Sequence, residues 1–310
     1  MTKSRASPLR HGAKPRRATS PNGGGLAIIG PGAIGGTVAA HLSPSHPDLA
    51  LCARTAFARL IVETPQGRIE VAPTVLTDPA TAGAVDWVLV ATKTYDVAGT
   101  ALWLERLMGP DTRLAVLQNG VEHVARFAPF VPVDRIVPVV VEIPAERSAP
   151  GLIVQRRDGW LKVPAGANGE AFAALFRTPG IEASTTEDWT SVAWRKLAVN
   201  SAGAVNALTG RPAGIAARQD IADLMRGLVA ECLAVGRAEG ATLDEDLPDR
   251  VVDQYRASPP DSVNSLLADR LAGRPMEWDA RNGVIARLGT VHGIATPLNA
   301  MAASLLSAAE

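Results

Sequence analysis

A glycine-rich segment near the start of the chain has the spacing of a phosphate-binding loop. Residues 30–35, GPGAIG, form a G-x-G-x-x-G sequence between an apolar run at 26–29 and a helical pattern that includes Val38 and Leu42. The first glycine permits a tight turn, the second admits a pyrophosphate, and the third lets the helix pack closely. An ordinary glycine-rich turn is the alternative. The predicted cofactor contacts, with helix N–H groups among them, are Gly30, Gly32, Ala33, Ile34 and Gly35.

The end of the second expected strand, residues 49–53, indicates which dinucleotide the loop binds. A chain that selects NAD carries Asp or Glu at this point to hold the adenosine ribose hydroxyls. Here Arg54 follows the strand, whereas Asp48 precedes it and lies at the opposite end. A guanidinium suits a 2′-phosphate through charge-assisted hydrogen bonds. We therefore predict NADP with Arg54 as a contact; otherwise Arg54 is a solvated loop residue.

Two further polar residues follow apolar runs that have the composition of buried strands. Lys93 comes after residues 85–91, and Asn119 comes after residues 113–117. Ligands of open parallel sheets bind beyond the carboxyl ends of the strands, so both are candidate site residues. The alternatives are a surface lysine and a turn-forming Asn-Gly pair.

These candidates need an open parallel sheet, and the first half of the chain predicts one. Further strands are expected at 136–141 and, as a hairpin-like edge, within 152–163. From residue 188 the pattern is helical, with helices that include 194–200 and helices near 221–239, 263–271, 277–291 and 298–308. The predicted fold class is α/β: an N-terminal Rossmann dinucleotide-binding domain with a parallel sheet (26–187) plus an all-helical C-terminal domain (188–310), with a small-molecule cleft between them.

Length and composition limit the class of protein. A chain of 310 residues exceeds the usual single-domain size. No apolar run approaches the roughly 18 residues that span a bilayer, so no membrane partner is expected. Two distant cysteines, Cys52 and Cys232, argue for a reducing compartment. We expect a soluble, cytoplasmic protein that could form a homodimer.

The first 25 residues differ from the rest of the chain in charge and composition. They contain six basic residues and no acidic one, which leaves 25 basic against 31 acidic residues elsewhere. An acidic body is a poor nucleic-acid binder. The segment is rich in Ser, Pro and Gly, so we interpret 1–25 as a disordered basic tail. A mitochondrial presequence shares this composition, but an amphipathic apolar face is missing.

Several segments together resemble the ketopantoate reductase family. They are residues 30–35, the Lys93 segment, Gln118-Asn119-Gly120, residues 194–200 (WRKLAVN) and residues 273–277 (GRPME). The resemblance covers about residues 26 to 305, with the motifs in the family's order. It implies NADPH-dependent reduction of a 2-oxo acid to a 2-hydroxy acid. In the family this is the conversion of 2-dehydropantoate to pantoate, which serves pantothenate and coenzyme A synthesis.

The resemblance also implies roles for individual residues. Lys196 corresponds to the family's catalytic lysine, Asn200 and Ser265 to substrate contacts, and Glu277 to a glutamate of the catalytic and cofactor site. Lys93 and Asn119 correspond to residues beside the nicotinamide, and Lys93 is also a candidate substrate contact.

The chemistry of such a reduction explains the choice of a lysine. Hydride transfer to a ketone carbon leaves negative charge on the oxygen, which an ammonium group can stabilise and then protonate. Four residues apart on a helix, Lys196 and Asn200 share a face. We expect Lys93 to be a second cation that lowers the pKa of Lys196, and Glu277 to hold Lys196 or to bind substrate hydroxyls.

Each of these residues also has a plain structural interpretation. Lys196, next to Arg195, could lie on a solvated helix face. Glu277 could be a first-turn carboxylate that matches a helix dipole, and Ser265 a small polar residue on an exposed face.

One position departs from the family pattern. The resemblance implies a second asparagine four residues after Asn200, but Ala204 stands there. Asn206 is off the Asn200 face unless Gly203 breaks the helix. Three hypotheses therefore stay open: a ketopantoate reductase, a reductase of a different small oxo or imino acid, and a non-catalytic dinucleotide-binding sensor. No metal is expected, because the five histidines are scattered.

The composition of the tail generates a first prediction. Deleting residues 1–23 should leave the melting temperature and the turnover unchanged, because this segment holds too little apolar surface to stabilise the fold. Thermal unfolding and steady-state kinetics of the shortened chain check this. A large fall in either quantity would mean that the basic tail docks on the acidic body.

Overall fold

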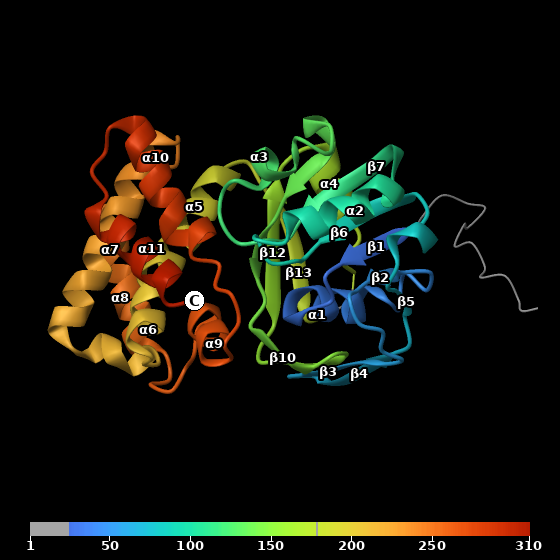
Figure 1. Ribbon diagram of the computed structural model, residues 1–310, viewed down its shortest axis with the longest axis horizontal. Helices are drawn as coiled ribbons and strands as arrows, with labels where there is room; N and C mark the ends of the chain where they lie inside the picture. The colour runs from blue at the N-terminus through green and yellow to red at the C-terminus, as the bar shows by residue number, and fades with distance from the viewer. Residues whose placement is uncertain (1–24, 178) are drawn as a thin grey trace, which may run out of the picture.

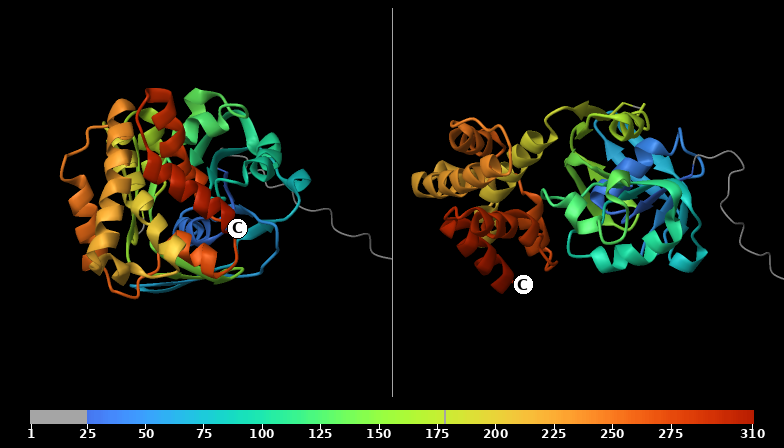
Figure 2. Two further views of the ribbon diagram at one scale, coloured as in Figure 1. Left: turned by 60° about the vertical axis from the view of Figure 1, so that its left-hand side comes forward. Right: turned by 90° about the horizontal axis from the view of Figure 1, so that it is seen from above.

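The computed structural model describes residues 25–177 and 179–310. Strands with helices between some of them extend as far as residue 186, and from residue 189 on the regular elements are helices (Figure 1). Seen from above, the α/β part and the helical part lie side by side (Figure 2). The expected tail at 1–25 lies outside the described residues, except for Gly25.

A six-stranded sheet forms the centre of the α/β part. All its neighbouring strands are parallel, in the order β5-β2-β1-β6-β7-β8. The strands are β1 (Leu26–Ile29), β2 (Ala50–Cys52), β5 (Thr74–Leu76), β6 (Val85–Val90), β7 (Met108–Val116) and β8 (Ile136–Pro138). The order reverses between β1 and β6, which opens a crevice at the carboxyl ends of these two strands. The predicted α/β class with a parallel sheet is confirmed.

Both faces of this sheet are buried, and alternate residues of each strand enter different cores. Leu26, Ile28 and Leu89 face α1 (Ala33–Leu42). Ile29 and Val90 face the opposite core, which the helices α2 (Val97–Leu107) and α3 (His123–Phe127) cover. Burial on both faces requires apolar residues at every position, so such strands are continuous apolar runs in the sequence.

Two smaller sheets lie on the α1 side of the central sheet. The first has the order β10-β11-β3-β4 and consists of β3 (Leu60–Thr64), β4 (Gly67–Val71), β10 (Ala145–Ala149) and β11 (Leu152–Gln155). The second has the order β13-β12-β9 and consists of β9 (Val140–Glu142), β12 (Gly159–Pro164) and β13 (Ile181–Thr186), with α4 (Ala167–Ala173) between its last two strands.

These sheets correct two expectations about the strands. The hairpin expected within 152–163 is wrong, because β11 pairs with β10 and β3 whereas β12 pairs with β9 and β13. The strand expected at 136–141 is divided into β8 and β9, which belong to different sheets. Pro138 ends β8, and Val139 N still donates a hydrogen bond to Val116 O before β9 begins.

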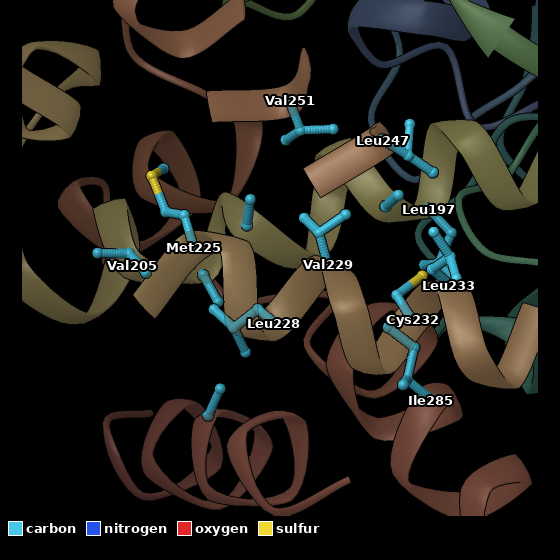
Figure 3. Close-up of a cluster of buried hydrophobic side chains, with 14 of the residues drawn as sticks. Leu197, Val205, Met225, Leu228, Val229, Cys232, Leu233, Leu247, Val251 and Ile285 are labelled. Atoms are coloured by element: carbon cyan, nitrogen blue, oxygen red, sulfur yellow. The ribbon is translucent and has the colours of Figure 1, made fainter. Parts of the chain in front are cut away.

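The helical part packs around the long helix α7. Its helices are α5 (Trp189–Ala202), α6 (Ala204–Thr209), α7 (Gln219–Ala238), α8 (Leu247–Ala257), α9 (Ser265–Leu271), α10 (Val284–His292) and α11 (Pro297–Ala308). Met225, Leu228, Val229 and Cys232 line one face of α7 and meet side chains from α5, α8 and α10 (Figure 3). None of the helices in the described ranges is long and apolar enough to cross a membrane.

Two features of this part position the site. Asp188 caps α5, because its carboxylate accepts a hydrogen bond from Ser191 N at 3.0 Å directly after β13. The helix expected at 277–291 begins instead with a π-helical turn, Asp279–Gly283, before α10. Such turns displace side chains from regular helical positions and are frequent at functional sites.

Candidate active site

The glycine loop joins β1 to α1 with the geometry that a pyrophosphate needs. Gly30 has φ +87°, and a Cβ atom there would lie 2.8 Å from Thr92 Cγ2. A Cβ on Gly35 would overlap the carbonyl oxygen of Gly30. A Cβ on Gly32, by contrast, would meet nothing closer than 4.0 Å. The loop is therefore tight at both ends and open in the middle, which fits a bound dinucleotide.

The first turn of α1 is prepared for an anion. Its N-cap residue, Gly32, has no capping side chain, and the turn has no acidic residue. The first N–H groups of a helix have no partner within the helix, and the helix dipole favours negative charge there. Arg54 is exposed just beyond β2 and takes part in no ion pair among the described residues. These residues could hold the phosphates of NADP.

Arg54 and Lys93 act on a common neighbour, Tyr95. Burial raises the pKa of Tyr95 above its ordinary value, while the positive charges of Lys93 and Arg54 lower it in part. The two cations therefore lie near the same rim of the sheet, where the strand ends meet.

A buried carboxylate, Glu277, links the ends of β6 and β7 to the helical part. Its Oε2 lies 3.2 Å from Lys93 Nζ and accepts a hydrogen bond from Asn119 Nδ2 at 2.9 Å. Its Oε1 accepts a hydrogen bond from Thr94 N at 3.0 Å. Burial raises the pKa of Glu277, but Lys93, Arg281 and these hydrogen bonds together lower the pKa by more than burial raises it. The net pKa therefore lies below its ordinary value. Glu277 is therefore an ionised anchor.

Lys93 has a second acidic partner, Asp269 on α9. The distance from Lys93 Nζ to Asp269 Oδ2 is 2.6 Å, and Asp269 is only 4% exposed. Burial lowers the pKa of Lys93, but Glu277 and Asp269 raise it more, and the net pKa is above its ordinary value. Lys93 is therefore protonated, and the negative charges of two carboxylates balance its positive charge.

A small pocket lies between α5 and the ends of β7 and β9. Its walls include Lys196 and Asn200 from α5, Asn119 and Gly120 after β7, and Val140 from β9. The structure therefore brings together three of the residues that the sequence predicts, Lys196, Asn200 and Asn119. They form a basic and amide-lined pocket at the junction of the two parts.

Lys196 is the titratable group of this pocket whose pKa lies closest to neutral pH. Burial, together with the positive charge of Arg281, lowers the pKa of Lys196 to about 8. Its Nζ forms an ion pair with Glu142 Oε2 at the end of β9, a contact that favours the ammonium form. His123 also lines the pocket, but burial and the neighbouring Arg126 lower the pKa of His123 to about 4, so His123 is neutral.

The structure corrects the expected partners of Lys196. Glu277 contacts Lys93, Thr94 and Asn119, and the acidic partner of Lys196 is Glu142. The second cation that lowers the pKa of Lys196 is Arg281. Arg281 is four residues after Glu277, a helical spacing that could have identified it from the sequence. Glu142 gives only a weak signal, as a polar residue that ends an apolar run.

The two remaining predicted positions lie around α9 and α6. Ser265 begins α9, and its Oγ accepts a hydrogen bond from Arg281 Nη2 at 2.8 Å. The helix is interrupted at Gly203, which lies between α5 and α6. The break turns Asn206 into the protein interior, where its side chain binds Arg211 O and the Asn264 amide.

Gln118 is a structural residue of the site that the sequence reasoning did not single out. Its Nε2 donates hydrogen bonds to Thr92 O and Thr92 Oγ1, both at 3.1 Å, and its Oε1 accepts one from Arg126. These contacts fix the loop after β6 to the loop after β7. They therefore hold Lys93 and Asn119 at a constant separation.

Comparison with known proteins places this architecture. The family model described as ketopantoate reductase PanE/ApbA matches residues 26–168, and its C-terminal counterpart matches residues 188–310. A 2-dehydropantoate 2-reductase of Caulobacter vibrioides is 60% identical over 286 residues, which are 92% of this chain and 98% of that protein.

Solved structures agree with this match. The crystal structure of a 2-dehydropantoate 2-reductase from Geobacter metallireducens has a TM-score of 0.87 at 29% identity and covers 92% of this chain and 100% of that one. A structure described as a dimeric ketopantoate reductase from Staphylococcus aureus has a TM-score of 0.82 at 26% identity, with 92% and 98% covered.

The glycine loop generates a paired prediction. Gly32→Ala should weaken NADPH binding by about tenfold or more and leave the melting temperature unchanged, because its Cβ enters the space reserved for the pyrophosphate. Gly35→Ala should instead lower the free energy of unfolding by about 1–3 kcal/mol, because its Cβ overlaps Gly30 O. Fluorescence titration with NADPH and denaturant unfolding separate the two effects. Normal binding by Gly32→Ala would show that the pyrophosphate does not cross Gly32.

Proposed function

Because the chain belongs to the ketopantoate reductase family, we propose that it reduces 2-dehydropantoate to pantoate with NADPH, using Lys196 as the general acid. The observation that carries the proposal is the pocket at the junction of the two parts. There Lys196, with its lowered pKa, and Asn200 on the same helix face Asn119. In this proposal residues 26–187 form the NADP-binding domain and residues 188–310 the catalytic domain.

The proposed cofactor site uses the glycine loop and the rim of the sheet. The pyrophosphate contacts are Gly30, Gly32, Ala33, Ile34 and Gly35, and Arg54 binds the 2′-phosphate. Lys93, Asn119 and Glu277 support the nicotinamide end, because they meet at the carboxyl ends of β6 and β7. When bound there, NADPH supplies the hydride.

Lys196 is suited to act on the carbonyl oxygen of the substrate. Its ammonium group can stabilise the negative charge that develops on this oxygen and then donate a proton to it. A pKa near 8 makes it a stronger acid than an exposed lysine while it stays charged at neutral pH. Asn200, one helical turn later, can donate a hydrogen bond that orients the carbonyl group.

Glu277 is proposed as a positioning residue. Its two carboxylate oxygens are occupied by Lys93, Thr94 and Asn119, so it is placed to hold these groups. Lys196, the proposed proton donor, and Glu277 thus belong to different ion pairs. Ser265 remains a proposed substrate contact, through the hydrogen bond that it accepts from Arg281.

One observation favours a second candidate substrate. Ala204 offers no amide, and Asn206 is buried in contacts with Arg211 and Asn264. The pocket could therefore accept a different small oxo or imino acid. Following NADPH absorbance with a panel of 2-oxo acids that includes 2-dehydropantoate decides between them. A non-catalytic sensor would bind NADPH and reduce none of the panel.

The proposal includes a cytoplasmic homodimer that serves pantothenate synthesis. The dimeric Staphylococcus aureus structure supports the assembly state. Sedimentation of the purified chain measures it directly.

The cofactor proposal predicts a selective effect at Arg54. Arg54→Ala should weaken NADPH binding by roughly ten- to hundredfold, the worth of charge-assisted hydrogen bonds, and leave NADH binding nearly unchanged. Arg59→Ala is the matched control, because Arg59 is also exposed and pairs with Glu70. Titration of each variant with both dinucleotides gives the result. An equal loss of NADPH and NADH binding would show that Arg54 does not meet the 2′-phosphate.

The mechanism predicts a large effect at Lys196. Lys196→Ala should reduce kcat and kcat/KM together by roughly two to four orders of magnitude and preserve NADPH affinity. Lys196→Arg should not restore activity, because a guanidinium keeps its proton. The proton donor must be protonated, so the wild-type rate should fall as the pH rises through about 8. A variant that retained most of the turnover at the wild-type pH optimum would assign the proton to another group.

A further inference from the structure

Arg281 is a buried cation that forms no ion pair in the part of the chain that the structure describes. It lies on the π-helical turn before α10 and is only 2% exposed. Its Nη2 donates a hydrogen bond to Ser265 Oγ, but its Nε is buried and has no hydrogen-bond partner. No ion pair within the described ranges includes Arg281. A buried charge of this kind is strongly unfavourable unless an anion meets it.

The surrounding carboxylates are already engaged by other cations. Glu277 binds Lys93, Thr94 N and Asn119, as described above. Asp269 pairs with Lys93 and with Arg274, whose Nε lies 3.0 Å away. Glu142 pairs with Lys196 and with Arg157. None of these three carboxylates forms an ion pair with Arg281, so its guanidinium is left open to an anion that the described part of the chain does not supply.

Arg281 lies within electrostatic reach of the reacting groups. Its charge contributes to the lowered pKa values of both Lys196 and Glu277. Asn282, the next residue, donates a hydrogen bond to Ser201 O at 3.2 Å, which ties the π-helical turn to the end of α5 beside Asn200. Ser265 thus holds the guanidinium, and Asn282 holds the turn that carries it, within electrostatic reach of the proposed proton donor.

We propose that Arg281, together with Ser265 Oγ, binds the carboxylate of the 2-oxo acid substrate and makes the enzyme selective for acids over neutral ketones. The inference rests on the proposed function. In a 2-oxo acid the carboxylate is bonded directly to the reacting carbonyl carbon, so a site that protonates the carbonyl oxygen needs a cation for the neighbouring carboxylate. The planar guanidinium matches a carboxylate through paired hydrogen bonds.

This assignment also accounts for the alanine at position 204. Ala204 offers no amide to a substrate, and in this proposal the guanidinium of the π-helical turn is the polar group that binds it instead. A charged fork in place of an amide would favour binding of the carboxylate end of the substrate over recognition of its far hydroxyl.

The test compares an acid with its neutral amide. In Arg281→Met, kcat/KM for the 2-oxo acid should fall by about two to three orders of magnitude, the cost of removing one partner of a buried charge pair. For the primary amide of the same acid it should change by less than about threefold. Arg281→Lys keeps the positive charge but loses the paired N–H donors of the guanidinium. This variant should retain part of the preference for the acid. Arg226→Met is the control, because Arg226 is an arginine of the same helical part in surface ion pairs with Asp223 and Asp249.

Stability and binding give readouts that do not depend on turnover. Arg281→Met should keep or raise the melting temperature, because it removes an unpaired buried charge. Calorimetry should show weaker binding of the 2-oxo acid to the NADP-loaded variant than to the NADP-loaded wild type. A lower melting temperature with an unchanged acid-to-amide ratio would show that Arg281 is structural and would overturn the inference. If Arg281→Met does not fold, the acid-to-amide ratio of Arg281→Lys decides, and an unchanged ratio overturns it.

The same measurements separate this inference from the proposed function. A wild-type protein that reduces no 2-oxo acid, yet binds one in a manner that requires Arg281, contradicts the proposed function and supports the carboxylate site. Turnover by the wild type with an acid-to-amide preference that Arg281→Met retains contradicts the carboxylate site alone.

Discussion

The hydrogen bonds of one buried carboxylate, Glu277, hold the two parts of the molecule together at the site. A carboxylate that loses its hydration is stable only when its oxygens are fully engaged. Here Lys93, Thr94 N and Asn119 engage them, and all three belong to loops that follow β6 and β7. Separating the two parts would remove these partners from Glu277. The contact between the two parts and the ionised state of Glu277 therefore depend on each other.

The elements that are buried on both sides can be predicted from the sequence, and so can the positions at which the candidate site residues follow them. β1 is a continuous apolar run, and β6 and β7 each end in one, so the ends of these runs indicate where the glycine loop, Lys93 and Asn119 meet. Lys196 and Asn200 share a helical face, and the structure places both in one pocket. Tests of the Gly32 and Lys196 variants therefore address features that the sequence itself predicts.

The features that the sequence does not predict depend on contacts between distant segments. Strand β3 pairs in parallel with β11, far away in the chain, and three of its five residues are not buried, so no local pattern marks this pairing. The same is true of the pairing of Glu142 with Lys196 and of Asp269 with Lys93, which join different sheets and helices. Propensity and spacing specify an element, whereas a charge pair depends on how elements pack.

Lys93, Lys196 and Arg281 differ chiefly in the anions around them. This difference suits the three cations to different tasks. Lys93 has two buried carboxylates, which raise its pKa and make it a permanent charge. Lys196 has one carboxylate, and burial beside Arg281 lowers its pKa, so it can part with a proton. Arg281 has no paired carboxylate among residues 25–177 and 179–310, and a guanidinium does not release its proton at any working pH. A group that stays charged can bind an anion through a reaction in which its neighbour changes protonation. In the proposed mechanism a lysine therefore suits the proton donor and an arginine suits the carboxylate receptor. With the two residues exchanged, the reaction would have no acid.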